Sequence, residues 1–521
     1  MKLNINDTFN KELPADPILE NSRRQVTDAC FSFVNPAIPA EPKLLHISKE
    51  VASFLGLSEE DIASKEFLDV FTGAKILDGS RPYAMCYGGH QFGNWAGQLG
   101  DGRAINLAEV LHNKQRWTLQ LKGAGATPYS RRADGLAVLR SSIREHLCSE
   151  AMFHLGVPTT RSLSLSLSGS EVLRDVMYNG NSAYEKGAIV CRVSPSFIRF
   201  GNFEILASRK DHVTLKKLTD YTIKHFFPEI KTTGKEAYIQ FFNSVLDKTL
   251  KMVVEWQRVG FVHGVMNTDN LSILGLTIDY GPYGWLEGYD KEWTPNTTDR
   301  QNRRYRYGQQ TSVALWNLYQ LANALFPLIE DSKPLEDALE RYKMDFAQAN
   351  TEMMKSKLGL VTDHKDDTLL FSTIEETLSL TETDMTIFFR LLGRVSKTDD
   401  SELMLAQIKK AFYKPEELTA EVSDQWLHWL KNYGERLQQE ELSDVERRVM
   451  MEKVNPKYVL RNYMAQVAID AADEGDYSVI EELYQLLKRP YAEQVGMEKW
   501  FVKRPEWARD RVGCSMLSCS S

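Results

Sequence analysis

The spacing of apolar residues changes once along the chain, near residue 210, and that change limits the folds open to it. From about 80 to 205 the chain is rich in Gly and contains alternating runs such as RWTLQLK and RSLSLSLSG, which are typical of strands. From about 215 onward the apolar residues recur at helical spacing, in long runs such as EAYIQFFNSVLDKTLKMVVEWQRVG and QQTSVALWNLYQLANALF. We therefore expect a mainly β amino-terminal part followed by a mainly α part.

One helix is predicted inside the β part. In LAVLRSSIREHLCSEAMFHLG the apolar residues Leu139, Ile143, Leu147 and Ala151 recur every four positions, and Gly156 follows as a stop signal. An amphipathic helix of this kind buries its apolar stripe against a neighbouring element. We expect it to pack inside a small sheet.

A single short stretch interrupts the helical part. The run LSILGLTIDYGP reads as a β-hairpin or as a strand that ends at Asp279, and it follows HGVMNTDN, residues 263–270. This loop is similar to the catalytic loop of protein kinases, in which His-Arg-Asp precedes four residues and Asn, and DYGP is similar to the kinase Asp-Phe-Gly segment. Val265 stands where a kinase carries its Asp, and an acid appears instead as Asp269, just before Asn270.

The order of these segments predicts the fold class. A β part with one helix, followed by helices with such a loop between them, is the two-lobed plan of a protein kinase, with the nucleotide in the cleft. We expect an α+β fold of this type, atypical or pseudokinase, with a large helical C-terminal lobe. The expected parts are an N-terminal lobe at 1–210, a C-terminal lobe at 211–500 and a cysteine-containing tail at 501–521, with no low-complexity linker.

Asn270 and Asp279 are candidate metal ligands. Mg²⁺ bound to a nucleotide takes one or two protein oxygens and completes its shell with phosphate oxygens and water. Alternatively, each residue caps a turn, as Asn and Asp commonly do. Their joint position around one apolar hairpin favours the metal. Asp269 could accept the proton of an incoming hydroxyl or hold a water on the metal, and the sequence leaves both roles open.

Several basic residues could contact phosphate. Lys122 ends a predicted strand and Glu145 lies in the predicted helix, as in the lysine–glutamate pair of kinases. Arg192 and Arg199 lie among apolar neighbours in CRVSPSFIRFGNFE and need anionic partners, either polyphosphate or Asp and Glu. Fixed cations around the far end of a triphosphate suit a reaction in which pyrophosphate leaves.

Two glycine-containing turns are weaker signals. GQLGDGR, residues 97–103, could bring backbone N–H groups to phosphate, with Arg103 adding charge. It lacks the spacing of both the P-loop and the dinucleotide fingerprint, so a plain hairpin turn is the alternative. The same holds for ADG at 133–135, which contains Asp134 and Gly135.

Charge and composition exclude several classes of partner. The net charge of −8 is spread without a Lys/Arg block, which argues against nucleic acid or an anionic membrane as partner. No apolar stretch approaches the roughly 20 residues of a membrane span, and the first residues resemble no targeting leader, so we expect a cytoplasmic protein. Among the six cysteines, Cys148 and Cys191 are expected in the core, whereas Cys514 and Cys519 are expected to be accessible.

Four blocks of the chain resemble the selenoprotein O family, protein adenylyltransferases with a pseudokinase fold. They are YGGHQFGNWAGQLGDGR, LQLKGAGATPYSRRADGLAVLRSSIREHL, CRVSPSFIRFGNFE and GFVHGVMNTDNLSILGLTIDYGPYG, and the SCSS ending also fits. The resemblance implies that ATP binds in a flipped orientation and that AMP passes to Ser, Thr or Tyr hydroxyls of proteins. Some members use manganese and transfer UMP from UTP.

The resemblance also implies roles for individual residues. Glu145 would pair with Lys122, Asn270 and Asp279 would bind Mg²⁺ or Mn²⁺, and Asp269 would accept the proton. The residues that would contact the nucleotide are Gly100, Gly102, Arg103, Lys122, Asp134, Gly135, Arg192, Arg199 and Asp279.

The tail resembles a cysteine-containing form of the family, with Cys519 in the position of selenocysteine, and the absent leader indicates a bacterial protein. Some members close a redox bond between the tail and the catalytic loop, but this chain has no cysteine between 191 and 514. Cys514 is then the nearest alternative partner. Two other functions remain open from the residues alone: a protein kinase that transfers the γ-phosphoryl group, and a nucleotide-binding scaffold without turnover.

Overall fold

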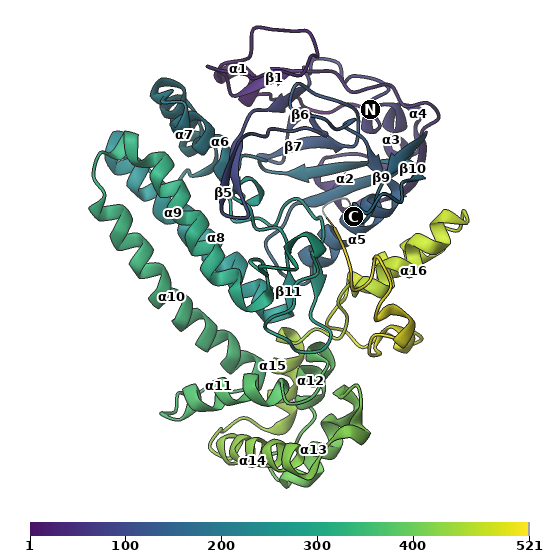
Figure 1. The fold of residues 1–521 in the computed structure, drawn as a ribbon, viewed down its shortest axis with the longest axis vertical. Helices are drawn as coiled ribbons and strands as arrows, with labels where there is room; N and C mark the ends of the chain where they lie inside the picture. Colours follow the sequence, from purple (N-terminus) through teal and green to yellow (C-terminus); the bar gives the residue numbers. More distant parts are fainter. Residues whose placement is uncertain (519–521) are drawn as a thin grey trace.

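The computed structural model describes residues 1–518 and shows a mixed α+β fold, with a β-sheet in the N-terminal region and a large helical region after it (Figure 1). The predicted change in character is confirmed, since β10 (Ala183–Ser194) is followed by α6 (Phe200–Ser208) and then mainly by helices. No helix among the described residues combines the length and apolar composition that a membrane crossing requires.

Within residues 1–518, eight strands form the main sheet, and every pairing in it is antiparallel. Its order is β1-β3-β6-β7-β10-β9-β2, with β8 paired to β10. The predicted strand RWTLQLK lies at its centre, in β7, and RSLSLSLSG lies in β9, next to the edge strand β2. The other bounds are β1 Phe31–Phe33, β2 Lys43–Ile47, β3 Tyr83–Met85, β6 Ala104–His112, β7 Gln115–Lys122, β8 Ala137–Val138 and β9 Arg161–Arg174.

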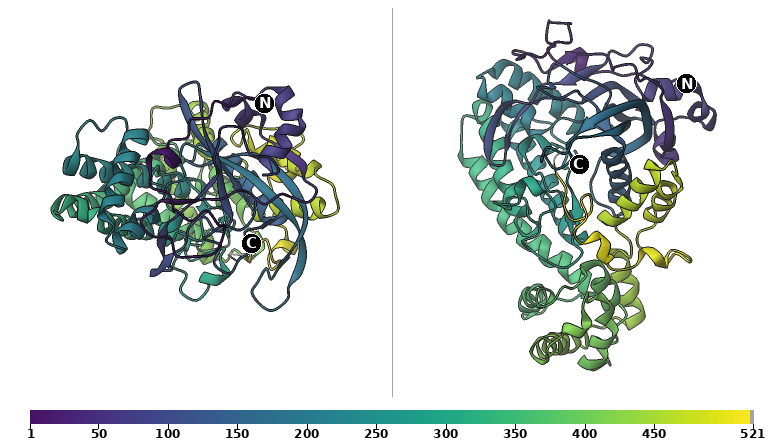
Figure 2. Two further views of the ribbon diagram at one scale, coloured as in Figure 1. Left: turned by 90° about the horizontal axis from the view of Figure 1, so that it is seen from above. Right: turned by 45° about the vertical axis from the view of Figure 1, so that its right-hand side comes forward.

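The predicted helix is α5 (Leu139–His154), and Gly156 follows it with a φ of +79°. The helix is buried on nearly all sides instead of only on one apolar stripe. One side contacts β9 and β10, and the C-terminal helices α16 (Asn462–Asp473) and α17 (Ser478–Leu487) cover another side (Figure 2). Residues near the end of the chain therefore complete the burial of a helix in its first third.

The helical region contains long helices that cross beneath the sheet and a lower group that extends away from it (Figure 1). The predicted helical runs are confirmed, and their apolar faces form two cores, one continuous with the sheet and one within the lower group. The division into lobes at 1–210 and 211–500 stays a prediction. The main helices are α7 His212–Phe226, α8 Gly234–Val259, α9 Gln310–Ile329, α10 Lys333–Leu358, α11 Asp367–Leu378, α12 Met385–Leu392, α13 Ser401–Ile408, α14 Ala420–Leu437 and α15 Asp444–Val454.

Two small sheets bring loops of the two regions together. The strands β11 (Phe261–Val262) and β12 (Gly284–Trp285) pair and close the loop that contains the kinase-like motif. The hairpin of β4 (Gly88–Gln91) and β5 (Asn94–Gln98) reaches this loop, because the His90 N–H donates to Thr268 Oγ1 at 2.7 Å. The motif is thus clamped between the sheet region and the helices.

A buried ion pair inside the helical region gives a test of the fold. Arg461 Nη1 and Nη2 lie 2.6 and 2.9 Å from Asp384 Oδ2 and Oδ1, and both side chains are almost fully buried. Asp384→Ala should lower the free energy of unfolding by about 3–5 kcal/mol, because a buried guanidinium loses its counter-charge. Chemical denaturation measures the change.

The control is Asp337→Ala, which removes the exposed i,i+4 pair with Lys333. Exposed pairs of this kind contribute only about 0.3–0.5 kcal/mol. Equal losses in the two variants would contradict the assigned importance of the buried pair.

Candidate active site

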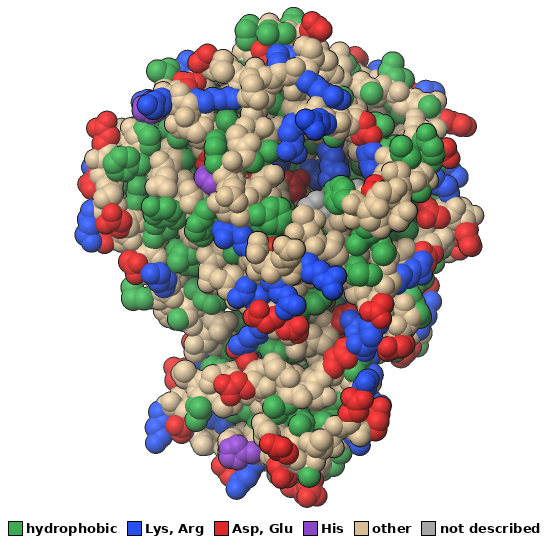
Figure 3. Space-filling view, viewed as in Figure 1, with side chains coloured by type: hydrophobic (Ala, Val, Ile, Leu, Met, Phe, Trp, Pro, Cys, Tyr) green, Lys and Arg blue, Asp and Glu red, His purple; other side chains and the backbone are tan. Residues whose placement is uncertain are grey.

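A cavity of about 430 Å³ lies where the sheet region meets the kinase-like loop. Its walls come from the glycine-rich turn at 99–104, the end of β7, β10, the loop at 265–270 and the segment 279–282. Figure 3 shows a hollow in this face of the molecule that is bordered by Lys and Arg side chains. Most of the predicted site residues line this one cavity.

Glu145 is the anchor of the basic residues. Its carboxylate accepts hydrogen bonds from Lys122 Nζ and Arg192 Nε, and all three side chains are buried. The expected lysine–glutamate pair is confirmed. Burial lowers the pKa of Lys122 to about 8, although Glu145 opposes this shift. The two cations keep the pKa of Glu145 below its usual value in spite of burial.

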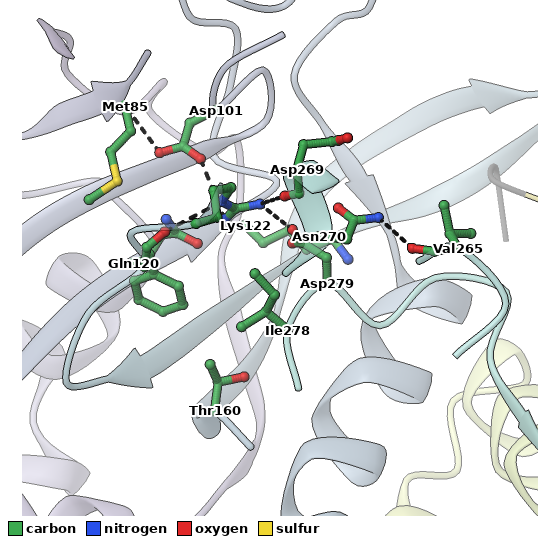
Figure 4. A network of polar contacts seen from close by, with 12 residues as sticks. Met85, Asp101, Gln120, Lys122, Thr160, Val265, Asp269, Asn270, Ile278 and Asp279 are labelled. Carbon is green, nitrogen blue, oxygen red and sulfur yellow. Dashed lines mark hydrogen bonds and ion pairs between the residues drawn. The ribbon is translucent and has the colours of Figure 1, made fainter. Parts of the chain in front are cut away.

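Asp279 lies between two arginines. Figure 4 shows its side chain with those of Asp269 and Asn270, which line the same cavity. Arg192 Nη1 is 3.0 Å from its Oδ1, and Arg199 Nη1 donates to its Oδ2. Burial opposes the charge of Asp279, but Arg199 and Arg192 outweigh burial and lower its pKa. Its φ of +56° is a conformation that non-glycine residues adopt at an energetic cost.

Of the two alternatives for Arg192 and Arg199, the structure shows the ion pairs with carboxylates. Arg192 also lines the cavity, so it can still contact a ligand. Arg199 does not line it. Its Nη1 donates to the Asp269 carbonyl at 2.9 Å as well as to Asp279, and it lies beside the buried Asp101. Arg199 therefore acts on the site through Asp279.

Asp269 and Asn270 belong to a 3-10 turn, Thr268–Asn270, and both line the cavity. The Asn270 amide donates to the Val265 carbonyl at 3.0 Å, which leaves the side-chain oxygen available. Burial raises the pKa of Asp269 to about 7, although Arg199 opposes it. Asp269 Oδ2 accepts from Gln91 Nε2 at 3.3 Å, whereas its buried Oδ1 has no hydrogen-bond partner among the described residues.

The hairpin expected between Asn270 and Asp279 is present as one antiparallel bridge, Leu271 to Thr277, around Gly275 with a φ of +61°. The buried His263 donates its Nε2–H to the Ile278 carbonyl at 2.9 Å. This histidine ties the start of the loop to the residue before Asp279. It holds the backbone of the site and does not line the cavity.

The oxygen atoms of Asn270 and Asp279 suit a hard cation that takes most of its ligands from a bound triphosphate. Within residues 1–518, no three His, Cys, Asp or Glu side chains gather closely enough to hold a metal ion by themselves. A metal at this position would thus depend on the nucleotide for much of its coordination.

The glycines of the turn allow close packing. Gly100 has a φ of +76°, and a Cβ there would lie 2.4 Å from Tyr129 Cγ. A Cβ on Gly102 would lie 3.0 Å from the Tyr129 carbonyl oxygen. Both glycines and the exposed Arg103 line the cavity. The turn is therefore pressed between the cavity and the segment that contains Tyr129.

Asp134 and Gly135 are not brought to the cavity wall. Asp134 is exposed and pairs with Arg174, with distances of 2.7 and 2.8 Å. Gly135 has a φ of +75°, and a Cβ there would lie 2.2 Å from the Gly125 carbonyl oxygen. In this structure both residues shape a loop, and their contact with a nucleotide stays a prediction.

The sequence interpretation missed Gln91, Phe92 and Asn267, which also line the cavity. A signal was present in YGGHQFGNW, because adjacent glycines often mark a close backbone approach. A Cβ on Gly89 would lie 2.7 Å from Asp269 Oδ1. That contact explains why glycine precedes the hairpin residues that reach the site.

The cysteines differ in part from expectation. Cys148 and Cys191 are in the core, as predicted. Cys514, which was expected to be accessible, is buried, and burial raises the pKa of its thiol to about 11. Its carbonyl accepts from the Asn462 amide at 2.6 Å, so this part of the tail packs against α16. Cys519 lies outside the described residues.

A buried lysine–glutamate pair, further fixed cations and two carboxylates in unlike environments around one cavity are typical of the active site of an enzyme. The chain belongs to the family described as Protein adenylyltransferase SelO, which matches residues 18–488. It is 63% identical over 519 residues to Protein nucleotidyltransferase YdiU of Flavobacterium johnsoniae, covering 100% of this chain and 99% of that protein. Proteins of the same name from Rhodopirellula baltica and Azoarcus sp. are each 53% identical to this chain, over 536 and 518 residues. Each alignment covers at least 99% of this chain and 99% of the relative. The protein is therefore an enzyme of the nucleotidyltransferase class.

The raised pKa of Asp269 predicts a pH-dependent stability difference in metal-free protein. Its folded pKa of about 7 exceeds the ordinary value of 3.8, so folding disfavours the charged form. This penalty is absent below the ordinary pKa, grows as the pH rises toward the folded pKa and is constant above it. Asp269→Asn does not titrate and should have the higher free energy of unfolding at about pH 8, by about 1–3 kcal/mol.

Chemical denaturation in a chelator, at about pH 4 and about pH 8, measures this difference. Asp337→Asn, on an exposed helix surface away from the cavity, serves as the control for the loss of a carboxylate. A difference between Asp269→Asn and the parent that does not grow with pH would show that Asp269 titrates normally.

Proposed function

We propose that the chain transfers AMP from ATP to Ser, Thr or Tyr hydroxyls of other proteins and releases pyrophosphate. The observation that carries this proposal is the buried network in which Glu145 and Asp279 hold Lys122, Arg192 and Arg199 at one side of the cavity. The family and the names of the relatives support the same reaction.

We propose that the fold is the two-lobed, kinase-like fold of a pseudokinase. A strand lysine paired with a helix glutamate, and a loop that presents Asn270 and Asp279 across the same cavity, support this assignment. Val265 stands where a kinase catalytic loop carries its Asp, and it supplies no carboxylate there. This difference is consistent with a reaction other than transfer of the γ-phosphoryl group.

The cations would stabilise the leaving group. Attack on the α-phosphorus breaks its bond to the bridging oxygen, so negative charge develops on pyrophosphate. Lys122, Arg192 and Arg103 line the cavity and would meet this charge directly. Glu145 and Asp279 fix the two buried cations in position, and no reorganisation is then needed during the reaction.

Asn270 and Asp279 would hold Mg²⁺ or Mn²⁺, which supplies charge neutralisation to the bound phosphates. Asp279 suits this task because its arginine neighbours keep it ionised. These residues would contact phosphate and metal and not the base, so the same proposal extends to UMP transfer from UTP with manganese.

Asp269 would accept the proton of the acceptor hydroxyl. Its Oδ1 lacks a partner within residues 1–518 and can take a hydrogen bond from that group. A pKa of about 7 suits a base that works near neutral pH. Acceptor proteins with accessible hydroxyls are thus the proposed partners, and a cytoplasmic location stays a prediction.

Parallel reactions with α-labelled and γ-labelled ATP test the reaction. The α-label should enter acceptor protein and the γ-label should not, since the γ-phosphate leaves with pyrophosphate. A chelator should abolish transfer, and Mg²⁺ or Mn²⁺ should restore it. Label from the γ position alone would indicate a kinase instead, and ATP binding without any transfer would indicate a scaffold.

Substitutions should separate the roles of the two carboxylates. Asp269→Asn should lower the rate of α-label transfer by about 10²–10⁴-fold, because it removes the proton acceptor but keeps the shape. Its affinity for ATP should change little. Asp279→Asn should lower both transfer and metal-dependent ATP affinity, as measured by calorimetry. Asp337→Asn is the matched control, and a similar loss in that variant would contradict both assignments.

A further inference from the structure

A second cavity, of about 410 Å³, lies next to the proposed active site. Phe92 lines both cavities and forms the wall between them. The second cavity is built from the segment before α9 and from the first turns of that helix. Its lining residues are Phe92, Asp299, Asn302, Arg304, Arg306, Gln309, Ser312, Val313 and Trp316.

The dividing wall is held in a fixed place. Phe92 has a φ of +50°, and its N–H donates to Tyr305 Oη at 2.9 Å and to Asn267 Oδ1 at 3.2 Å. The Tyr305 hydroxyl in turn donates to Asn267 Oδ1 at 2.6 Å. The hairpin tip, the loop with Asp269 and the segment with Arg304 are thereby joined. A peptide lying across Phe92 would reach both cavities at once.

Arg304 has an exceptional environment for a guanidinium. It lies 4.6 Å from the ring centroid of Trp316, and its Nε is buried without a hydrogen-bond partner. No ion pair between Arg304 and a carboxylate occurs within the part of the chain that the structure describes. Gly93 lies against it, since a Cβ there would be in ordinary contact with Arg304 Cζ, at 3.4 Å. Asp299 attracts Arg304 electrostatically but does not form an ion pair with it. A stacked arginine without an ion-paired carboxylate among the described residues is suited to bind an external anion.

The rest of the cavity adds to this preference. Asp299 is its single lining carboxyl, and its oxygens already accept from the backbone N–H groups of Arg304 and Tyr305, at 3.0 and 2.7 Å. Arg306 also lines this cavity, and its Nε forms an ion pair with Oε1 of the exposed Glu292 at 3.0 Å. The first turn of α9 contributes the positive end of a helix dipole.

We propose that this cavity binds an acidic side chain of the acceptor protein, close in sequence to the hydroxyl that is modified. The inference rests on the proposed function and specifies its substrates. Arg304 and Arg306 would contact the carboxylate, and Phe92 and Trp316 would contact the apolar part of the same segment. The modified serine, threonine or tyrosine would then have an acidic neighbour in the acceptor protein. Acceptors with basic neighbours at that position would be rejected.

Matched acceptor peptides test this preference. Three peptides differ only near the acceptor serine, where they carry Glu, Gln or Lys. The parent enzyme should transfer α-label to the Glu peptide with a kcat/KM about tenfold above that for the Gln peptide, and the Lys peptide should be poorest. Arg304→Ala should remove the preference, and Arg304→Glu should invert it toward Lys.

Arg300→Ala is the control, because Arg300 is an exposed arginine of the same segment that does not line the cavity. It should keep the preference for Glu. Equal kcat/KM for the three peptides, or an unchanged preference in Arg304→Ala, would overturn the proposal. A fall in ATP affinity in Arg304→Ala would also overturn it, by assigning the cavity to nucleotide phosphate.

A binding measurement separates this inference from the proposed function. Fluorescence anisotropy of the labelled Glu and Lys peptides, without nucleotide, should show tighter binding of the Glu peptide that weakens with salt. If the enzyme binds the Glu peptide selectively but transfers no α-label, the proposed reaction fails and the anion cavity stands. If the enzyme transfers α-label but does not bind the Glu peptide selectively, the proposed reaction stands and the anion cavity fails.

Discussion

The site depends on one buried carboxylate, that of Glu145. Buried charges are costly unless they are paired, and Glu145 is paired with both Lys122 and Arg192. This arrangement requires α5 to be shielded from water on the side away from the sheet. The helices α16 and α17 provide that cover. Residues near the end of the chain therefore contribute to the burial of the helix that contains Glu145.

Two aspartates that lie close together in this buried site have very different pKa values. Asp279 has arginines on both sides and stays ionised, whereas Asp269 is buried with an unpaired oxygen and a pKa near 7. Two carboxylates with opposite environments can serve as metal ligand and proton acceptor in one cavity. Arg199 links them, because one guanidinium contacts the carboxylate of Asp279 and the backbone of Asp269.

The hairpin of β4 and β5 connects this chemistry to the choice of acceptor. Its glycines allow the strand to pass against Asp269, and its tip places Phe92 between the two cavities. The hairpin is held against the helical region by hydrogen bonds to Thr268 and Tyr305. A rigid wall of this kind keeps a constant separation between a reacting hydroxyl and a neighbouring side chain, which is what sequence-selective modification requires.

The sequence by itself determined the order and type of the main elements and which residues of the loop at 263–279 are candidates for chemistry. Both follow from short-range rules, because backbone hydrogen bonding sets the apolar period and the motif is contiguous. Only the tertiary structure decided that Arg199 lies behind Asp279, that Asp134 turns outward to Arg174, that Phe92 enters the site and that Cys514 is buried. These outcomes depend on contacts between residues far apart in the chain, and apolar spacing carries no information about which distant charges will meet.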